Sequence, residues 1–103
     1  PQNQHVDAAL YELAWLLRDG GDAKQAESLF ARLYNNHRNS FYWPDAAYRM
    51  AQSAADQQDA GRAVKLLKEV VAANPDASVM QHALYLRAVA FKQIGFPIVG
   101  DLL

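Results

Sequence analysis

The sequence contains no cysteine, which excludes disulfide bonds, thiolate metal sites and cysteine nucleophiles. The sequence also lacks any apolar run close to the ~18–20 residues that a membrane-spanning helix needs, so we expect no direct membrane insertion. The formal net charge is only −1, which gives no strong electrostatic field to attract nucleic acid or acidic lipid. The length of 103 residues suits one domain with a small core.

What the chain does carry is an internal repeat with a period of 37 residues. Positions with the same residue in all three copies are Ala9, Ala46 and Ala83; Tyr11, Tyr48 and Tyr85; and Ala14, Ala51 and Ala88. The tyrosines are the better evidence, because three of the 5 tyrosines in the chain fall in register. A fixed period of about 20–50 residues is typical of proteins built from stacked repeats.

Apolar residues at helical spacing predict five helices that pair as antiparallel hairpins. We expect these helices over about 7–19, 22–34, 44–57, 59–73 and 77–94. Asp7, Asp22 and Asp59 are the expected N-caps of the first, second and fourth helices, because a carboxylate satisfies free N–H groups in the first turn. The glycine pair at 20–21 ends the first helix, since glycine readily adopts a positive φ.

We expect residues 1–103 to form a single domain of about two and a half repeats. The repeats cover about 7–43, 44–75 and an incomplete 76–95, followed by an irregular tail at 96–103. The aromatic residues 41–43 stand at the start of the second repeat. We interpret them as a wedge between neighbouring hairpins, with a ligand cage as the alternative.

Repeated helix–turn–helix units of this kind resemble the tetratricopeptide repeat (TPR) family. The family pattern has W-x-x-L-G-x-x-Y in the first helix of each unit, A-x-x-x-F in the second, and then a proline. The residues that carry the resemblance are Leu10, Leu13, Ala14, Leu17, Ala26 and Phe30 in the first copy; Ala47, Met50, Ala51, Ala54, Ala63, Leu67 and Pro75 in the second; and Leu84, Arg87, Ala88 and Phe91 in the third. The resemblance implies an all-α fold whose hairpins stack as a right-handed superhelix, or α-solenoid.

The sequence departs from the family pattern in its period, its glycines and its third copy. The period of 37 residues exceeds the usual ~34, alanine replaces glycine in every copy, and Arg87 stands where an apolar residue is expected. The long connection and the tyrosine of the first helix are most similar to bacterial envelope members of the family. Examples are the periplasmic coordinator of the Tol–Pal system and the lipoprotein of the outer-membrane barrel-assembly machinery. This likeness favours the periplasm or cell envelope, with the cytoplasm as the alternative.

No pattern in the sequence is typical of catalysis or metal binding. His5, His37 and His82 are far apart in the chain and belong to different expected elements. A metal site needs convergent ligands at a recognisable spacing, and none is present. Asp56 and Asp59 are explained as a surface acid at a helix end and a helix cap. We therefore expect no enzyme activity, no metal and no cofactor.

In the TPR family, the first helices of successive repeats line a concave groove that receives a peptide or helix of a partner protein. Carried onto this sequence, the groove residues are Tyr11, Trp15, Arg18, Asp45, Tyr48, Gln52, His82, Tyr85, Val89 and Lys92. Tyrosine and tryptophan are typical interface anchors. The resemblance thus implies a protein–protein interaction module, an adaptor or scaffold. Alternatively, the tyrosines only pack between repeats.

A second interpretation is a structural or oligomerising segment, whose groove or C-terminal face is filled by its own chain or by another copy. The fifth helix presents Leu84, Ala88 and Phe91, and no sixth helix follows. A large exposed apolar patch is uncommon in a soluble monomer. We therefore predict self-association through the C-terminal helix, with a folded-back tail or further residues of a longer protein as alternative covers. Because the chain begins at Pro1 without a methionine, we expect a piece of a longer protein or a processed form.

Overall fold

The computed structural model describes residues 5–95, and within this range the fold is all-helical, without a strand. Its helices are α1 (Val6–Asp19), α2 (Ala23–Asn36), α3 (Trp43–Asp56), α4 (Ala60–Ala72) and α5 (Ala77–Gln93). The prediction of an all-α hairpin solenoid is confirmed. The predicted tail at 96–103 lies outside the described residues.

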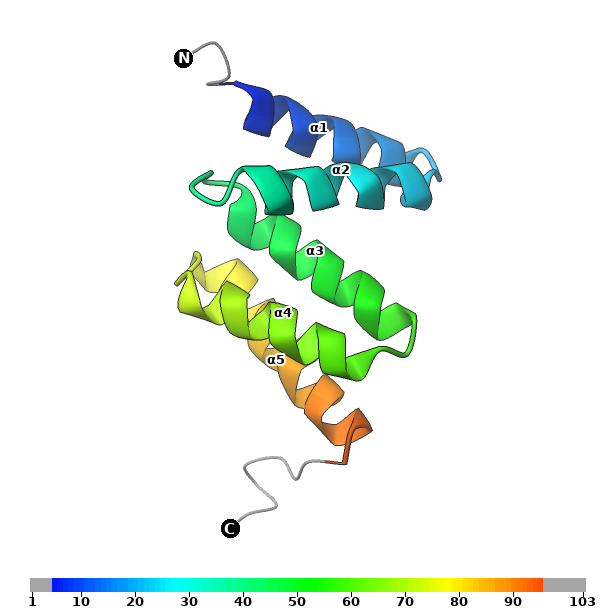
Figure 1. The fold of residues 1–103 in the computed structure, drawn as a ribbon, viewed down its shortest axis with the longest axis vertical. Coiled ribbons are helices and arrows are strands. Elements are labelled where there is room, and N and C mark those ends of the chain that lie inside the picture. Colours follow the sequence, from blue (N-terminus) through cyan, green and yellow to red (C-terminus); the bar gives the residue numbers. More distant parts are fainter. Residues whose placement is uncertain (1–4, 96–103) are drawn as a thin grey trace.

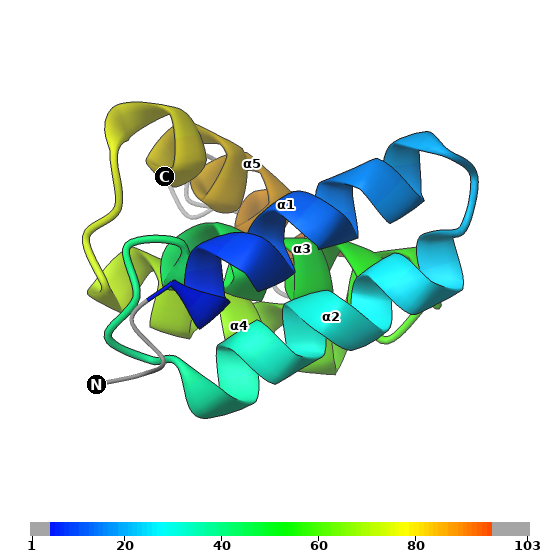
Figure 2. The same ribbon diagram turned by 90° about the horizontal axis from the view of Figure 1, so that it is seen from above.

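The helices stack in chain order. α1 packs on α2, α2 on α3, α3 on α4, and α4 on α5, while α5 also touches α3 (Figure 1). The short turns after α1 and α3 lie on one flank of the stack, at the right in Figure 1, and the connections after α2 and α4 lie on the opposite flank. Figure 2 shows α1 and α5 on one side of the molecule and α2 and α4 on the other, with α3 between them. The helices α1 and α5 therefore share a side of the molecule.

Aspartate caps begin three of the helices. The carboxylates of Asp22, Asp59 and Asp76 accept hydrogen bonds from the backbone N–H groups of residues 25, 62 and 79, at 3.1, 3.1 and 3.0 Å. Each bond satisfies an N–H group that has no partner inside the helix. The predictions for Asp22 and Asp59 are confirmed.

The prediction that Asp7 caps α1 is wrong, because the helix begins one residue earlier, at Val6, after His5. The Asp7 carboxylate accepts hydrogen bonds from the backbone N–H of Ala8 and from the hydroxyl of Ser40. The bond from Ser40 lowers the pKa of Asp7 below its usual value. Asp7 thus connects the start of α1 to the α2–α3 connection.

Small residues are fully buried where neighbouring helices pack together. Ala14 of α1 and Ala26 of α2 are buried in one core cluster, as are Ala51 of α3 and the larger Leu67 of α4. Small side chains let two helices approach closely, and a larger side chain at such a contact would overpack it. The core between these contacts is filled mainly by Phe30, Leu33, Leu67 and Val70.

The aromatic residues 41–43 were interpreted as a wedge between hairpins, and two of the three fit this interpretation. Trp43 is 4% exposed, donates its indole N–H to the Tyr34 carbonyl at 2.9 Å and stacks on the Tyr34 ring at 5.4 Å. Tyr42 stacks on Tyr11 of α1 at 4.6 Å. Both rings wedge between hairpins as predicted. Phe41 does not, since 84% of its surface is exposed.

Candidate protein-binding site

A cavity of about 480 Å³ lies on the flank of the stack that holds the connections after α2 and α4. We call it the aromatic cavity. Its lining residues are Tyr11 and Trp15 of α1; Ser40, Phe41 and Tyr42 of the α2–α3 connection; Pro44, Asp45, Tyr48 and Arg49 of α3; and Ala73, Asn74, Pro75, Asp76, Ser78, Val79 and His82 from the end of α4 to α5. One wall comes from the α2–α3 connection and another from the start of α5. Residues from the three helices α1, α3 and α5 therefore converge on one cavity.

A polar network fixes the aromatic rings of α1 against α3. The Tyr11 hydroxyl donates to Asp45 Oδ2 at 2.7 Å, and Arg49 Nε lies 3.5 Å from Asp45 Oδ1. The Arg49 guanidinium lies over the Trp15 ring at 4.6 Å and over the Tyr48 ring at 5.0 Å. Such stacking is favourable because the ring faces are electron-rich. These contacts hold Tyr11, Trp15 and Tyr48 in the wall of the cavity.

Burial and the network raise the pKa of two tyrosines of the cavity. Burial, followed by the hydrogen bond to Asp45, raises the pKa of Tyr11 to about 12. Burial also raises the pKa of Tyr48, although the nearby Arg49 opposes this. Both phenols therefore keep their protons to a higher pH than an ordinary tyrosine does.

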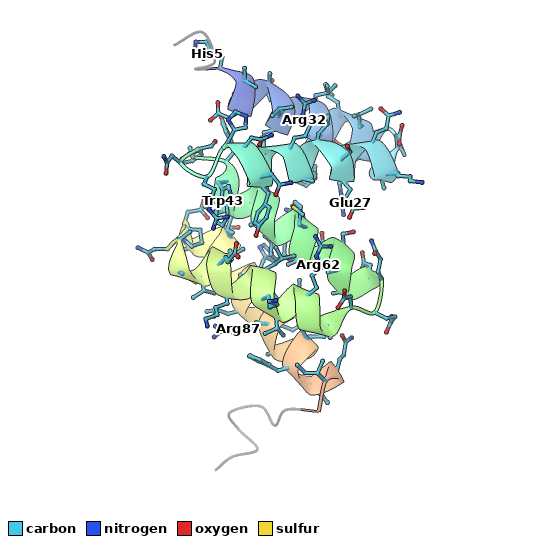
Figure 3. All side chains as sticks on the ribbon, in the orientation of Figure 1. His5, Glu27, Arg32, Trp43, Arg62 and Arg87 are labelled. Carbon is cyan, nitrogen blue, oxygen red and sulfur yellow. The ribbon has the colours of Figure 1, made fainter. Side chains whose placement is uncertain are left out.

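A second cavity, of about 640 Å³, lies between the N-terminal half of α2 and the C-terminal half of α3. Arg49 lines both cavities. The Ser53 hydroxyl crosses this second space to donate to Glu27 Oε2 at 2.7 Å. Glu27 is half-buried, because α3 lies against it on this side. Figure 3 shows Glu27 and Trp43 at opposite ends of the α2–α3 contact.

The structure brings only some of the predicted groove residues together. Tyr11, Trp15, Asp45, Tyr48 and His82 line the aromatic cavity. Arg18 and Gln52 line the second cavity. Tyr85, Val89 and Lys92 line neither of them, and Tyr85 is 74% exposed on α5.

Sequence reasoning missed Arg49 and the walls made by the two connections. Arg49 follows Tyr48 directly and Asp45 by one helical turn, so the spacing held a signal for an ion pair. Phe41 was noticed only as a member of an aromatic group. The stretch 73–79 was predicted only as the end of one helix and the start of the next. The repeated sequence pattern does not indicate that this stretch and the α2–α3 connection line the same cavity.

Neither metal ligands nor a membrane span emerges from the described part of the chain. Among residues 5–95, no group of three or more His, Cys, Asp or Glu side chains is placed to hold a metal ion. None of the described helices is long and apolar enough to cross a bilayer.

Comparison with protein families gives one match. The sequence model of the tetratricopeptide repeat matches residues 8–40 and 45–77, which together cover more than half of the chain. Comparisons with curated proteins and with solved structures gave no match. The match is to the repeat itself and gives no support to the narrower likeness to bacterial envelope proteins. Tetratricopeptide repeats are non-enzymatic units that generally mediate protein–protein interaction, and this chain belongs to the tetratricopeptide repeat family.

Proposed function

We propose that the chain is a non-enzymatic adaptor that binds a peptide segment of a partner protein in the aromatic cavity. The observation that carries the proposal is Phe41, which is 84% exposed on the wall of this cavity of about 480 Å³. An exposed phenylalanine beside a cavity lined by Tyr11, Trp15, Tyr42 and Tyr48 is the composition of a protein-binding anchor site.

The rigidity of the lining supports the same function. Tyr11 is held by Asp45, Trp15 and Tyr48 are held by Arg49, and Tyr42 is stacked on Tyr11. A preorganised surface binds more tightly because few side chains lose conformational freedom on binding. Phe41 contacts the edge of Tyr42, with ring centroids 5.2 Å apart, and otherwise projects from the wall.

The test uses short random peptides displayed on phage and selected for binding to the protein. Phe41→Ser should lower the binding affinity of the selected peptides by at least about fivefold, since an interface anchor contributes more than ~1 kcal/mol to binding. The thermal midpoint should not change, because Phe41 is not part of the core. Tyr48 is a poor choice for truncation, since it is only 7% exposed.

The matched control is Leu16→Ser, which removes an apolar side chain that is 69% exposed on α1 and lines neither cavity. Its peptide affinity should equal that of the unaltered chain. Equal affinity of the Phe41→Ser variant and loss of affinity in the Leu16→Ser variant would contradict the proposed site.

The self-association predicted from the sequence stays a prediction. Leu84 of α5 is 41% exposed, whereas the residues at the same repeat position, Leu10 and Ala47, are 8% and 0% exposed. Their hairpin partners α2 and α4 cover them. Sedimentation at micromolar concentration should show a dimer that Leu84→Glu dissociates. A monomer whose sedimentation Leu84→Glu leaves unchanged would contradict this prediction.

A further inference from the structure

We propose that the segment bound in the aromatic cavity is extended rather than helical, and that it carries a lysine or arginine beside an apolar side chain. This inference rests on the proposed function and specifies the chemistry of its ligand. Two features of the cavity support it: its unused hydrogen-bonding groups and its charge.

The first feature is a set of polar side chains that have no hydrogen bond to other described residues. These are the Tyr48 hydroxyl, the Asn74 amide, the Ser78 hydroxyl and the His82 ring, all of which line the cavity. His82 makes only a ring contact to Tyr48, with centroids 6.1 Å apart. An extended peptide offers free carbonyl and N–H groups along its length, whereas a helix uses these groups internally. The unused groups of the cavity therefore match an extended segment.

The second feature is charge. Asp45 is paired with Arg49, whose guanidinium lies over the Trp15 and Tyr48 rings, so this pair presents little net charge. Asp76 lies on the wall formed by the start of α5, and among the described residues it has no cationic partner. The partial positive charge at the start of α5, roughly half an elementary charge, offsets only part of the charge of this carboxylate. The cavity is therefore slightly acidic, which favours a basic ligand residue over an acidic one.

The experiment is a phage selection with two arms. Random peptides are selected on the unaltered domain, and those that still bind the Phe41→Ser variant are removed. The remaining peptides should pair lysine or arginine with a neighbouring apolar residue. They should lack the apolar spacing of i, i+3 and i+4 that an amphipathic helix needs.

A charge test follows with one selected peptide made synthetically. Asp76→Asn removes the charge but keeps a good helix cap, so folding is preserved. Asp76→Asn should lower the affinity for the peptide about two- to fivefold, as expected for the loss of an exposed ion pair. The control is Asp59→Asn, the same change at the cap of α4, which lines neither the aromatic nor the second cavity. Its affinity should not change.

The outcomes separate this inference from the proposed function. If no peptide depends on Phe41, both the proposed function and the inference fail. If peptides depend on Phe41 but show helical spacing or acidic residues, only the inference is overturned. An affinity that is equal in Asp76→Asn and Asp59→Asn likewise overturns the inference and leaves the proposed function standing.

Discussion

Tyr11, Tyr48 and Tyr85 occupy the same position in three copies of the repeated sequence, yet their environments differ. Tyr11 donates a hydrogen bond to Asp45, 34 residues later. The residue 34 positions after Tyr48 is His82, which makes only a tilted ring contact. Tyr85 is 74% exposed. The register of the tyrosines was predictable from the sequence, but each environment depends on the residue that the next repeat places opposite.

The raised pKa of Tyr11 predicts a loss of stability at high pH. Its pKa in the folded state is about 12, against an ordinary value of 10.0, because burial and Asp45 favour the neutral phenol. The stabilisation is therefore complete below pH 10.0 and is lost as the pH rises through about 12. Tyr11→Phe should lower the free energy of unfolding by about 1–3 kcal/mol at neutral pH. Urea denaturation should show this difference shrinking between pH 10.0 and 12.

Tyr85→Phe is the control for that measurement, because it removes the same hydroxyl at the same repeat position from an exposed ring. It should change the free energy of unfolding little at any pH. A Tyr11→Phe difference that is the same at neutral and strongly alkaline pH would rule out the Tyr11–Asp45 bond as its source.

The two hairpin turns are the same element built from different residues. Gly21 in the first turn has φ +95°, and Gln58, 37 positions later, has φ +66°. In both turns the next aspartate donates its backbone N–H to the helix before it, at 2.8 Å. The helices and most of their ends were predictable from caps, glycines and apolar spacing. The start of α1 was not, because the Asp7 carboxylate is used by Ser40 of a distant connection.

The turn at Gln58 offers a stabilising substitution. A left-handed backbone costs a non-glycine residue about 1–2 kcal/mol, part of which the greater freedom of unfolded glycine offsets. Gln58→Gly should therefore raise the free energy of unfolding by about 0.5–1 kcal/mol, measured by urea denaturation. The reverse change in the other turn, Gly21→Gln, should lower it. A lower free energy of unfolding in Gln58→Gly would contradict this prediction. It would show that the exposed Gln58 side chain stabilises the fold by more than its backbone conformation costs.

At the scale of the whole molecule, the candidate site is a property of the stack rather than of any repeat. Its residues come from α1, α3 and α5 and from the connections after α2 and α4. The period of 37 residues, longer than the usual ~34, indicated that the connections are long. It did not indicate that both connections line one cavity. The sequence also could not show that Arg49 lines both cavities, because this depends on the spacing between hairpins.

The most direct test of the binding site uses the two tryptophans of the chain, which differ in place. Trp15 lines the aromatic cavity, whereas the indole of Trp43 is buried and bonded to the Tyr34 carbonyl at 2.9 Å. A peptide from the selection is titrated into the ¹⁵N-labelled domain while the two indole N–H signals are followed by NMR. The signal of Trp15 should move progressively with peptide concentration, and that of Trp43 should stay in place. Movement of the Trp43 signal with a stationary Trp15 signal would contradict binding in the aromatic cavity.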